Sequence, residues 1–472
     1  MGKTRLNALI NYQKNQIAAN RKEYGIYYDQ LKKPSYYRLI EADEERSRLI
    51  SEIEGKAGYL CNGTKPFAHA VSPGCRICGE GHWSCLFVNN RCNCSCFYCP
   101  TSQVDTSIPE TQGITFDKPE NYIEYIKKFG FKGIGLSGGE PLLTFGTTLD
   151  FLSKIKKELG DSVYVWMYTN GTLLDEEKAI KLAEAGLDEI RFDLAATEYN
   201  TKNLKLALGK IPNVTVEIPA IPEDIAQLKN MVIELDSLGV NYLNLHQMRL
   251  TPYNLKNLFN RNYTFLHGQK ITVLESELTA LEIINFVFQQ GLKLAVNYCS
   301  FHYKSHYQKS AFRKKAAAFV FNEQEEINQN GFIRNLSLQG VSMPLKALGS
   351  QLIKLSPEGN GWRISQDQGQ ISLTKNSLIQ MQLGQEPVFV DYKAAIINEM
   401  PLDEGTKIII SGSKHIFVVK DTGSASIEIN SKNRGSFCEI MEGRPSDNVM
   451  DSEELFNVSK KELQATGFAE YF

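Results

Sequence analysis

The sequence predicts an α/β fold made of a partial (β/α)6 barrel, with an N-terminal helical segment and a C-terminal mostly-β domain. Three observations support this prediction. Helix-forming residues dominate the start of the chain, strand-like and helix-like runs alternate through its middle, and short strand-like runs fill its end. We expect the helical segment at 1–60, the barrel with its flanking extensions at 61–320, and the β-rich domain at 321–472.

The N-terminal segment is predicted to be helical to about residue 57. It is rich in Lys, Glu, Arg, Leu and Tyr and has few helix breakers before Gly55. Its tyrosines are expected to pack the segment onto the main domain rather than to face a substrate. They are Tyr24, Tyr27, Tyr28, Tyr36 and Tyr37.

Six apolar runs in the middle of the chain are typical of β-strands, with amphipathic runs between them. The strand-like runs are SCLFV (84–88), GIGLS (133–137), VYVWMYT (163–169), IRFDLA (190–195), VTVEI (214–218) and YLNLH (242–246). The helix-like runs are 123–130, 151–159, 175–186, 226–239 and 274–291, the last followed by LKLAVNYC (292–299). Such alternation predicts a parallel sheet, in which active residues lie at the carboxyl ends of the strands.

The composition of the chain changes beyond about residue 348. Short β-like runs there are separated by Gly, Asn and Asp, which predicts a separate mostly-β domain. These runs are EPVFVDY, TKIIISG, HIFVVKD and SASIEIN.

The overall composition is that of an ordinary globular protein, with 42% hydrophobic and 22% charged residues. The formal net charge of −2 gives no general basis for nucleic-acid binding. No apolar run is long enough to span a bilayer, and the first residues lack the apolar core of a secretion signal. We therefore expect a cytoplasmic protein with reduced thiols and no membrane partner.

The cysteines are strongly clustered. Of the ten in the chain, only Cys299 and Cys438 lie outside residues 61–99. A disulfide scaffold would spread its cysteines through a short secreted chain, so this clustering indicates metal or redox chemistry.

The loop RCNCSCFYCP (91–100) contains the best-spaced set of thiols, Cys92-x3-Cys96-x2-Cys99. Structural zinc sites usually have four closed ligands. Three thiolates on a four-iron cluster instead leave one iron without a protein ligand, and an open position is typical of a catalytic metal centre. Cys94 does not fit this spacing and is expected to be a bystander.

The spacing CxxxCxxC, with Tyr98 before the last cysteine, resembles the hallmark of the radical S-adenosylmethionine (SAM) superfamily. The resemblance covers about residues 84–250 and extends to SGGEP (137–141), YTNG (168–171) and IRFDL (190–194). It implies a radical SAM barrel in which Cys92, Cys96 and Cys99 hold a catalytic [4Fe-4S] cluster. It also implies SAM contacts from Tyr98, Ser137, Gly138, Gly139, Glu140, Thr169, Asn170, Arg191 and Asp193.

These residue types suit the expected ligand on chemical grounds. Glycines at 138 and 139 would let the backbone approach a ligand closely. Glu140 offers a carboxylate to a cationic amine, and Thr169 and Asn170 offer polar groups to sugar hydroxyls.

The resemblance also implies a mechanism. A one-electron donor such as flavodoxin or ferredoxin reduces the cluster, and the electron splits SAM into methionine and a 5′-deoxyadenosyl radical. This radical removes a hydrogen atom from the substrate, while the protein places the target bond and excludes water.

A second group of cysteines precedes the cluster loop in SPGCRICGEGHWSC. The GCxxCxxG element and the downstream Tyr298-Cys299-Ser300 resemble a layout in uncharacterised radical SAM proteins, which suggests that Cys75, Cys78 and Cys299 act together. The fourth ligand could be Cys61, Cys85 or a substrate. The metal could be zinc or an auxiliary iron–sulfur cluster, and the alternatives are a structural zinc or buried thiols. His82, His302 and His306 are not included in the predicted site.

The substrate is expected to be a ribosomally made peptide or a protein, because the chain is large and has a second sulfur group and an additional β-domain. Backbone splicing with a small partner protein is one form of this prediction. The alternatives are a small molecule or RNA, or a non-catalytic cluster-binding redox protein. The basic, aromatic run at 301–315 could hold an acidic peptide or a phosphate group, although such runs are more often solvated.

Overall fold

The computed structural model describes residues 3–104, 108–339, 352–354, 361–365, 369–381, 383–400, 405–412, 414–421, 423, 425–446, 448–449 and 452–472. The chain divides into two compact units. Unit 1 contains Met1–Asn15 and Lys309–Ala465, and unit 2 contains Gln16–Gln308 and Thr466–Phe472. Both chain ends therefore belong to units that are built mostly from distant sequence.

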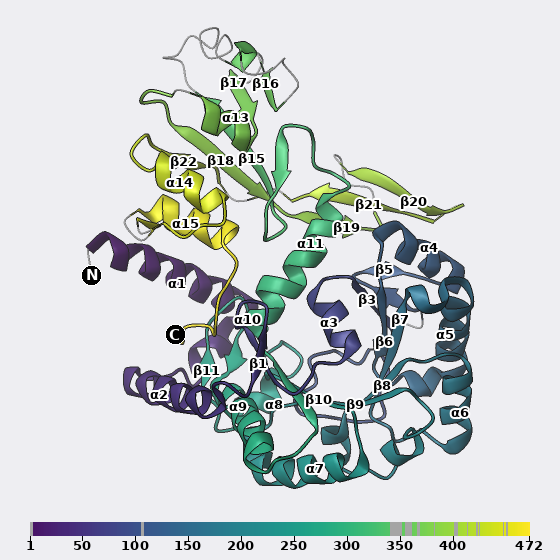
Figure 1. Cartoon of the computed structure of the whole chain (residues 1–472). Helices are drawn as coiled ribbons and strands as arrows, with labels where there is room; N and C mark the ends of the chain where they lie inside the picture. The colour runs from purple at the N-terminus through teal and green to yellow at the C-terminus, as the bar shows by residue number, and fades with distance from the viewer. Residues whose placement is uncertain are drawn as a thin grey trace. The chain divides into compact units, whose positions relative to one another are not determined.

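Unit 2 is built on a curved sheet whose central strands are parallel (Figure 1). Its six predicted strands are neighbours in chain order: β3 (Trp83–Asn89), β6 (Gly133–Gly138), β7 (Tyr164–Thr169), β8 (Glu189–Phe192), β9 (Asn213–Pro219) and β10 (Tyr242–His246). A seventh parallel strand, β13 (Ala295–Cys299), pairs with β10. The predicted (β/α)6 partial barrel is confirmed, and β13 extends it.

Short antiparallel strands complete both edges of this sheet. The hairpin of β1 (Gly58–Leu60) and β2 (Lys65–Ala68) pairs with β13. At the other edge, β4 (Glu110–Thr111) pairs with β3 and with β5 (Ile114–Thr115). The sequence analysis did not predict these strands, which are too short to show a clear alternating pattern.

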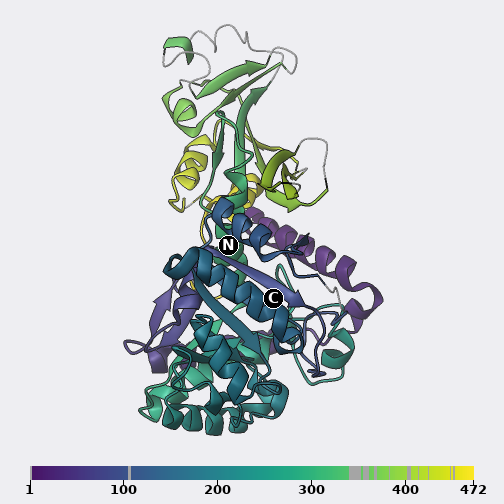
Figure 2. The ribbon, with the colours of Figure 1, turned by 90° about the vertical axis from the view of Figure 1, so that its right-hand side faces the viewer.

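The crossover helices cover the outer face of the sheet, blue to teal in Figure 2. They are α4 (Pro119–Phe129), α5 (Phe145–Leu159), α6 (Glu176–Glu184), α7 (Ile225–Leu238) and α9 (Leu274–Gln289). The crossover from β8 to β9 contains only the 3-10 turns η4 (Leu194–Thr197) and η5 (Leu204–Leu206). The short helix α3 (Pro73–Gly79) lies on the concave side and contacts β6 and β7 (Figure 1).

Helix α4 illustrates why these segments are helical. Proline at 119 fits the first helical position, where an amide hydrogen has no partner in the helix. The helix buries Tyr122, Ile123 and Ile126 on one side and ends at Gly130, which adopts the left-handed conformation with φ of 61°.

The N-terminal segment is helical, as predicted. It forms α1 (Lys3–Tyr24), the 3-10 turn η1 (Gly25–Gln30) and α2 (Tyr36–Ile53). Only some of its tyrosines pack inward: Tyr24 and Tyr28 are buried beside Leu250, whereas Tyr36 and Tyr37 are more than 70% exposed. The remaining elements of unit 2 are α8 (Leu255–Phe259), β11 (Phe265–Leu266), β12 (Thr272–Val273), α10 (Phe301–Tyr303), the π-helical turn η7 (Lys304–Gln308) and the 3-10 turns η2 (Pro141–Thr144), η3 (Gly160–Ser162) and η6 (Pro222–Asp224).

Unit 1 is mostly antiparallel β-structure, which confirms the predicted C-terminal fold. Its larger sheet contains β14 (Glu325–Ile327), β15 (Ile333–Gln339), β16 (Trp362–Ser365), β17 (Gln370–Leu373), β18 (Val388–Lys393) and β22 (Ile427–Ile429). The smaller sheet has β19 (Ala395–Asn398), β20 (Thr406–Ser411) and β21 (Lys414–Lys420). Its helices are α11 (Lys309–Ala317), α13 (Lys375–Gln380), α14 (Arg434–Met441) and α15 (Glu453–Glu462).

The core of unit 1 lies between the larger sheet and the helices α14 and α15, yellow in Figure 1. Trp362, Val390 and Ile440 are fully buried there. The start of α1 packs in the same unit, because Tyr12 lies edge-on against Phe456 with ring centres 5.7 Å apart.

Candidate metal centre and active site

The cluster loop, residues 90–104, follows β3 at the carboxyl edge of the parallel strands. Its thiols Cys92, Cys96 and Cys99 are half-buried, and the Cys99 amide donates to the Cys96 carbonyl at 3.1 Å, which forms a tight turn. Burial raises the pKa of Cys92, and it raises the pKa of Cys96 to about 12. The loop therefore holds its three thiols out of bulk water.

Polar groups surround the sulfur atoms of this loop. The Cys94 amide donates to Cys92 Sγ at 3.4 Å, and Asn170 Nδ2 lies 3.8 Å from the same sulfur. Gln103 Nε2 lies 3.6 Å from Cys99 Sγ and donates to the Cys94 carbonyl at 3.2 Å. Hydrogen bonds to thiolate sulfurs are one means by which proteins tune iron–sulfur clusters. Cys94 thus contributes its backbone amide and carbonyl to these contacts.

Gly138 and Gly139 allow the end of β6 to lie directly against the cluster loop. A Cβ at either position would lie 1.8 Å from a carbonyl oxygen, that of Asn89 for Gly138 and that of Arg91 for Gly139. The Gly139 and Glu140 amides donate to these same carbonyls, at 3.0 and 2.7 Å. The close approach that the two glycines permit in this structure is therefore to the chain itself.

The Glu140 carboxylate is fully buried and binds three groups of the protein. Oε1 accepts from the Leu142 amide at 2.9 Å and from Thr169 Oγ1 at 2.8 Å, and Oε2 accepts from the Asn170 amide at 2.7 Å. Burial raises the pKa of Glu140, and these donors oppose that rise. Glu140 thus joins the ends of β6 and β7 beneath the cluster loop.

Tyr98 connects the cluster loop to the end of β8. Its hydroxyl donates to the Asp193 carboxylate at 2.9 Å, and its carbonyl accepts from Asn254 Nδ2 at 3.0 Å. Burial raises the pKa of Asp193 to about 7, although the Tyr98 hydroxyl and two backbone amides oppose the rise. Two predicted SAM contacts are therefore hydrogen-bonded to each other.

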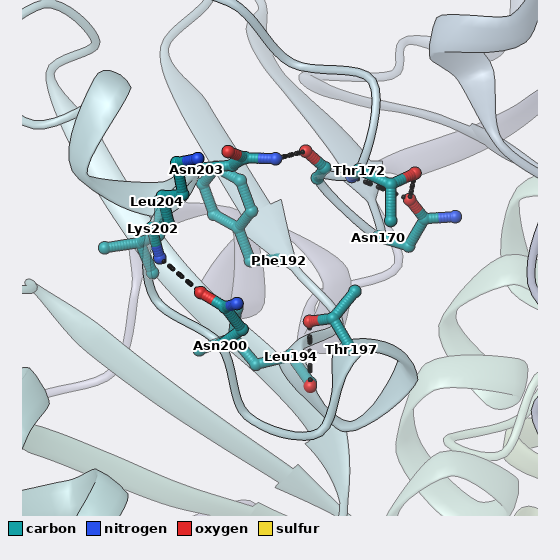
Figure 3. A pocket seen from close by; sticks show the side chains of 10 residues that line it. Asn170, Thr172, Phe192, Leu194, Thr197, Asn200, Lys202, Asn203 and Leu204 are labelled. Carbon is teal, nitrogen blue, oxygen red and sulfur yellow. Dashed lines mark hydrogen bonds between the residues drawn. The ribbon is translucent and has the colours of Figure 1, made fainter.

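Asn170 connects the loop after β7 to the cluster loop, since its Nδ2 donates to Asn93 Oδ1 at 2.8 Å. It also lines a pocket of about 300 Å³ (Figure 3). The other walls include Phe192 and, from the β8–β9 crossover, Leu194, Thr197, Asn200, Lys202, Asn203 and Leu204. Side chains alternate along a strand, so Phe192 points away from the face that carries Arg191, and this pocket lies outside the barrel lumen.

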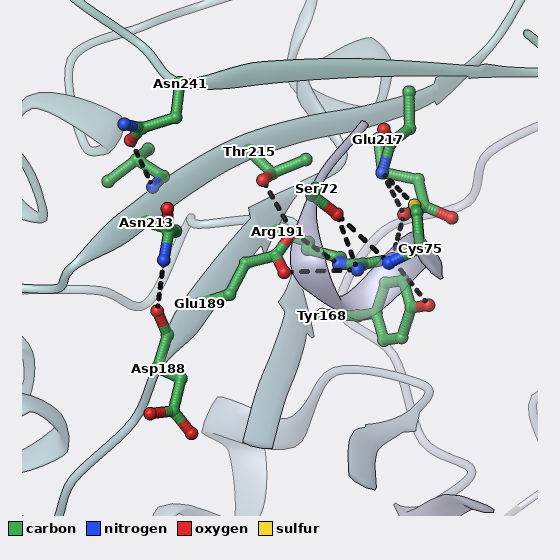
Figure 4. Close-up of polar contacts among 12 residues, drawn as sticks. Ser72, Cys75, Tyr168, Asp188, Glu189, Arg191, Asn213, Thr215, Glu217 and Asn241 are labelled. Atoms are coloured by element: carbon green, nitrogen blue, oxygen red, sulfur yellow. Dashed lines mark hydrogen bonds and ion pairs between the residues drawn. The ribbon is translucent and has the colours of Figure 1, made fainter. Parts of the chain in front are cut away.

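Arg191 is buried inside the lumen in a charge network (Figure 4). Its Nε lies 2.9 Å from Glu189 Oε1, and its Nη1 lies 2.8 Å from Glu217 Oε2. Nη2 donates to Ser72 Oγ at 3.3 Å, and the guanidinium lies 4.8 Å from the centre of the Trp166 ring. The Arg191 side chain therefore reaches toward α3.

A second group of cysteines interacts electrostatically with Lys65, a residue of β2, the strand that pairs with β13. Lys65 is fully buried, and the nearby sulfurs of Cys299, Cys75 and Cys78 outweigh the effect of burial and raise its pKa. Asn244 Nδ2 donates to Cys75 Sγ at 3.1 Å, and Gln308 Nε2 donates to Cys78 Sγ at 2.7 Å.

Cys61 belongs to the same group, since Lys65 and Cys299 both act on its pKa, which burial raises. Cys85 is separate: burial raises its pKa to about 12, and it is hydrogen-bonded to Ser137 on β6. Four of the five predicted second-site cysteines thus interact electrostatically with one buried lysine.

A site for a single metal ion needs several ligand side chains that converge on one point. Within the described residues, no group of three or more His, Cys, Asp and Glu side chains could hold one metal ion. The ligands of a four-iron cluster bind different irons, so they need not converge on one point.

Several residues in these sites were missed by the sequence analysis. Glu217, Asn244 and Asn297 are polar residues that stand among apolar residues in their strands. A polar residue at such a position could have indicated that one face of the sheet lines a polar lumen. Lys65 and Gln308 have no such signal, because each lies in a short or irregular segment.

None of the helices in the described ranges is long and apolar enough to cross a membrane.

Comparison with known proteins finds similarity in the central part of the chain. Residues 86–217 match the family model described as Radical SAM superfamily. The chain is 31% identical over 240 residues to a Methanocaldococcus jannaschii protein named as a candidate glycyl-radical enzyme activating enzyme, a match covering 48% of this chain and 62% of that protein. It is 28% identical over 161 residues to the GTP 3′,8-cyclase of Heliobacterium modesticaldum, covering 34% and 48%. The chain thus spans less than two thirds of these relatives.

Among solved structures, SuiB of Streptococcus suis bound to S-adenosylmethionine has a TM-score of 0.34 and 12% identity, with 65% of this chain and 67% of SuiB covered. A likeness of that size carries no argument about function.

Proposed function

Because residues 86–217 match the radical SAM family model, we propose that this chain is a radical SAM enzyme whose Cys92, Cys96 and Cys99 hold a [4Fe-4S] cluster. Such a cluster supplies reductive cleavage of SAM, and the resulting radical abstracts a hydrogen atom from the substrate. The observation that carries the proposal is the cluster loop, whose three thiols are half-buried and surrounded by N–H donors at the carboxyl edge of the strands.

The side chains around the loop would have distinct duties in this enzyme. Glu140 and the two glycines hold the loop against β6, and Asn170 fixes it through Asn93. Tyr98 and Asp193 lie on the opposite side, where they would present polar groups to SAM. Ser137, Thr169 and Arg191 complete the proposed set, with Arg191 acting from inside the lumen.

The test is formation of 5′-deoxyadenosine by anaerobically reconstituted protein with dithionite and SAM. We expect production by the parent and by Cys94→Ala, and none by Cys96→Ala. Equal production by Cys96→Ala would contradict the proposed ligand set. If the parent is inactive, adding a substrate-containing extract tests whether the substrate gates the reaction.

We further propose that the substrate is a ribosomally made peptide or a protein, with backbone splicing alongside a small partner protein as one form, and that a flavodoxin or ferredoxin supplies the electron. The name of the archaeal relative supports a protein substrate, since it describes an enzyme that activates another enzyme. The cyclase relatives support the alternative of a small molecule.

Fractionated cell extract distinguishes these substrates. A fraction above 3 kDa that stimulates 5′-deoxyadenosine formation and loses this effect after protease treatment supports the peptide or protein. A stimulating fraction that resists protease and passes the filter supports the small molecule.

The second sulfur group is proposed to bind an auxiliary iron–sulfur cluster through Cys75, Cys78 and Cys299, with Cys61 rather than Cys85 as a fourth thiol. The alternative, zinc, would need these thiols to converge on one ion, and no three such side chains among the described residues do so. Two observations support this proposal. The cysteine sulfurs interact electrostatically with the same lysine, Lys65, and the sulfurs of Cys75 and Cys78 each accept a hydrogen bond from a side-chain amide. A Cys75→Ala/Cys78→Ala variant should lose one zinc, or about four irons and their sulfide, relative to Cys438→Ala. Unchanged metal and sulfide content would sink this part of the proposal.

A further inference from the structure

Two basic side chains lie at the rim of unit 2 where β10 and β13 end. The strands end in register, with His246 opposite Cys299. Arg249 follows β10, and Lys304 follows β13. The Arg249 guanidinium lies 5.3 Å and the Lys304 ammonium 4.9 Å from the centre of the same Phe301 ring. The two cations therefore gather around one aromatic side chain.

Neither cation forms an ion pair with any described residue of the chain, although both are only partly exposed. The carboxylates that act on them electrostatically are engaged elsewhere. Glu217, which faces Lys304, binds Arg191 at 2.8 Å, and Glu23, which faces Arg249, binds Lys270 at 2.8 Å. A charge that is removed from water without a partner is costly, so unpaired cations of this kind are candidates for ligand binding.

The position of these cations is fixed by the backbone around them. Asn254 Nδ2 donates both to the Arg249 carbonyl and to the Tyr98 carbonyl of the cluster loop, each at 3.0 Å. The Phe301 amide donates to Gln247 Oε1 at 3.1 Å. Lys304 begins the π-helical turn η7, and such turns are frequent at functional sites. Asn254 thus joins the backbone of Arg249 to the cluster loop, and Lys304 lies near Arg249 through their shared contact with Phe301.

We propose that Arg249 and Lys304 form a subsite that binds a carboxylate or phosphate group of the substrate. This inference rests on the proposed function, since it places the anion beside the cluster loop where a target C–H bond would be held. The guanidinium offers two parallel N–H donors to such a group, and the ammonium adds a compact charge. Phe301 packs against both cations and limits their mobility.

The experiment measures binding to reconstituted holoenzyme under anaerobic conditions, without any turnover. The probes are fluorescently labelled hexaglutamate, which carries carboxylates, and a fluorescent GTP analogue, which carries phosphates. Hexaglutamine is the neutral control probe. The variant is Arg249→Gln/Lys304→Met, and the matched control is Lys314→Met, which removes an exposed lysine from α11.

We expect fluorescence anisotropy to show binding of at least one anionic probe and none of hexaglutamine. The double variant should weaken binding at least tenfold and reduce its salt dependence, whereas Lys314→Met should have little effect. Binding of hexaglutamate alone identifies carboxylate, and binding of the GTP analogue alone identifies phosphate.

The inference is overturned if neither anion binds at millimolar concentration, or if the double variant binds as the parent does. Iron content checks that the variant is folded, and Arg249→Lys, which keeps the charge but loses the fork, should fall between the parent and the double variant. The binding measurement does not involve SAM cleavage. A failure to bind the probes would therefore overturn the subsite without deciding whether the chain is a radical SAM enzyme.

Discussion

At the scale of single residues, Gly139 determines how closely the cluster loop can lie against β6. An added Cβ would lie 1.8 Å from the Arg91 carbonyl oxygen. The nearest atoms all belong to the backbone of Asn90 and Arg91, so no flexible side chain could move to make room. The residue therefore acts by what it lacks: its small size brings the Glu140 amide within 2.7 Å of the same carbonyl.

We predict that Gly139→Ala destabilises unit 2 by about 1 to 3 kcal/mol and lowers the iron bound at the cluster loop, because the loop backbone must shift. Gly146→Ala is the control, since a Cβ there meets no atom within 4 Å and alanine favours the helix α5. Urea unfolding and iron content measure both effects. Normal iron binding by Gly139→Ala would show that the loop tolerates the shift.

Sequence motifs identify functional residues more reliably than they identify the contacts of those residues. The spacing of Cys92, Cys96 and Cys99 predicts a shared loop, and in the structure all three are half-buried residues of the loop that follows β3. The same motif reading assigned Glu140 to an amine of the ligand, but its oxygens bind three groups of the protein. A motif identifies which residues matter; the partners of each oxygen depend on packing between β6 and β7, which local sequence does not encode.

At the scale of secondary-structure elements, α3 depends on a cap that also contacts the lumen. Ser72 Oγ accepts from the Cys75 amide at 3.2 Å and from the Arg191 guanidinium at 3.3 Å. The serine is completely buried. One hydroxyl thus starts the helix that carries Cys75 and Cys78 and also satisfies a buried cation.

We predict that Ser72→Ala costs about 1 to 3 kcal/mol, because it removes a helix cap and takes one acceptor from the buried Arg191 guanidinium, whose Nη2 keeps only its bond to Glu189. Ser35→Ala removes the exposed cap of α2 and should cost about 1 kcal/mol or less. Chemical unfolding of the two variants provides the comparison. Equal losses would mean that the contact with Arg191 contributes nothing.

The apolar strands of the barrel were the elements that the sequence predicted well. The run YLNLH was assigned to 242–246, and β10 occupies those residues. The hairpin of β1 and β2 was missed, since its strands are three and four residues long and are stabilised by pairing with β13, far along the chain. Such edge strands depend on tertiary contacts rather than on their own pattern.

At the scale of the whole molecule, acid should weaken unit 2 through His267. Burial lowers the pKa of His267 from 6.5 to about 4, and Lys33 adds to this effect. The unfolded chain therefore binds a proton before the folded one does, so the stability contributed above pH 6.5 is lost as the pH falls toward 4.

The full shift would correspond to roughly 3 kcal/mol, and screening of the partly exposed ring reduces this to about 1 to 2 kcal/mol. We expect His267→Gln to lose less stability than the parent between pH 7 and pH 5 in urea titrations. His69→Gln, which replaces an exposed histidine, should follow the parent. A His267→Gln curve parallel to that of the parent would refute the assignment.

The division of the chain into units was the hardest feature to predict. Periodicity located the barrel and the β-rich domain. It did not show that residues 1–15 belong to unit 1 or that residues 466–472 belong to unit 2. Asn11 and Tyr12 contact Glu453 and Phe456 in unit 1, and no pattern within α1 indicates that its first half and its second half belong to different units.

The return of residues 466–472 to unit 2 has a consequence for biosynthesis. The Ala469 carbonyl accepts from Arg46, and the Tyr471 hydroxyl donates to Glu277 at 2.6 Å. On the ribosome, the barrel strands emerge early, yet these contacts form only after all of unit 1 has been translated. More than 150 codons of unit 1 are therefore translated before residues 466–472 can pack against α2 and α9 of the newly made barrel. During that interval the barrel would be most accessible to chaperones and to proteins that load clusters.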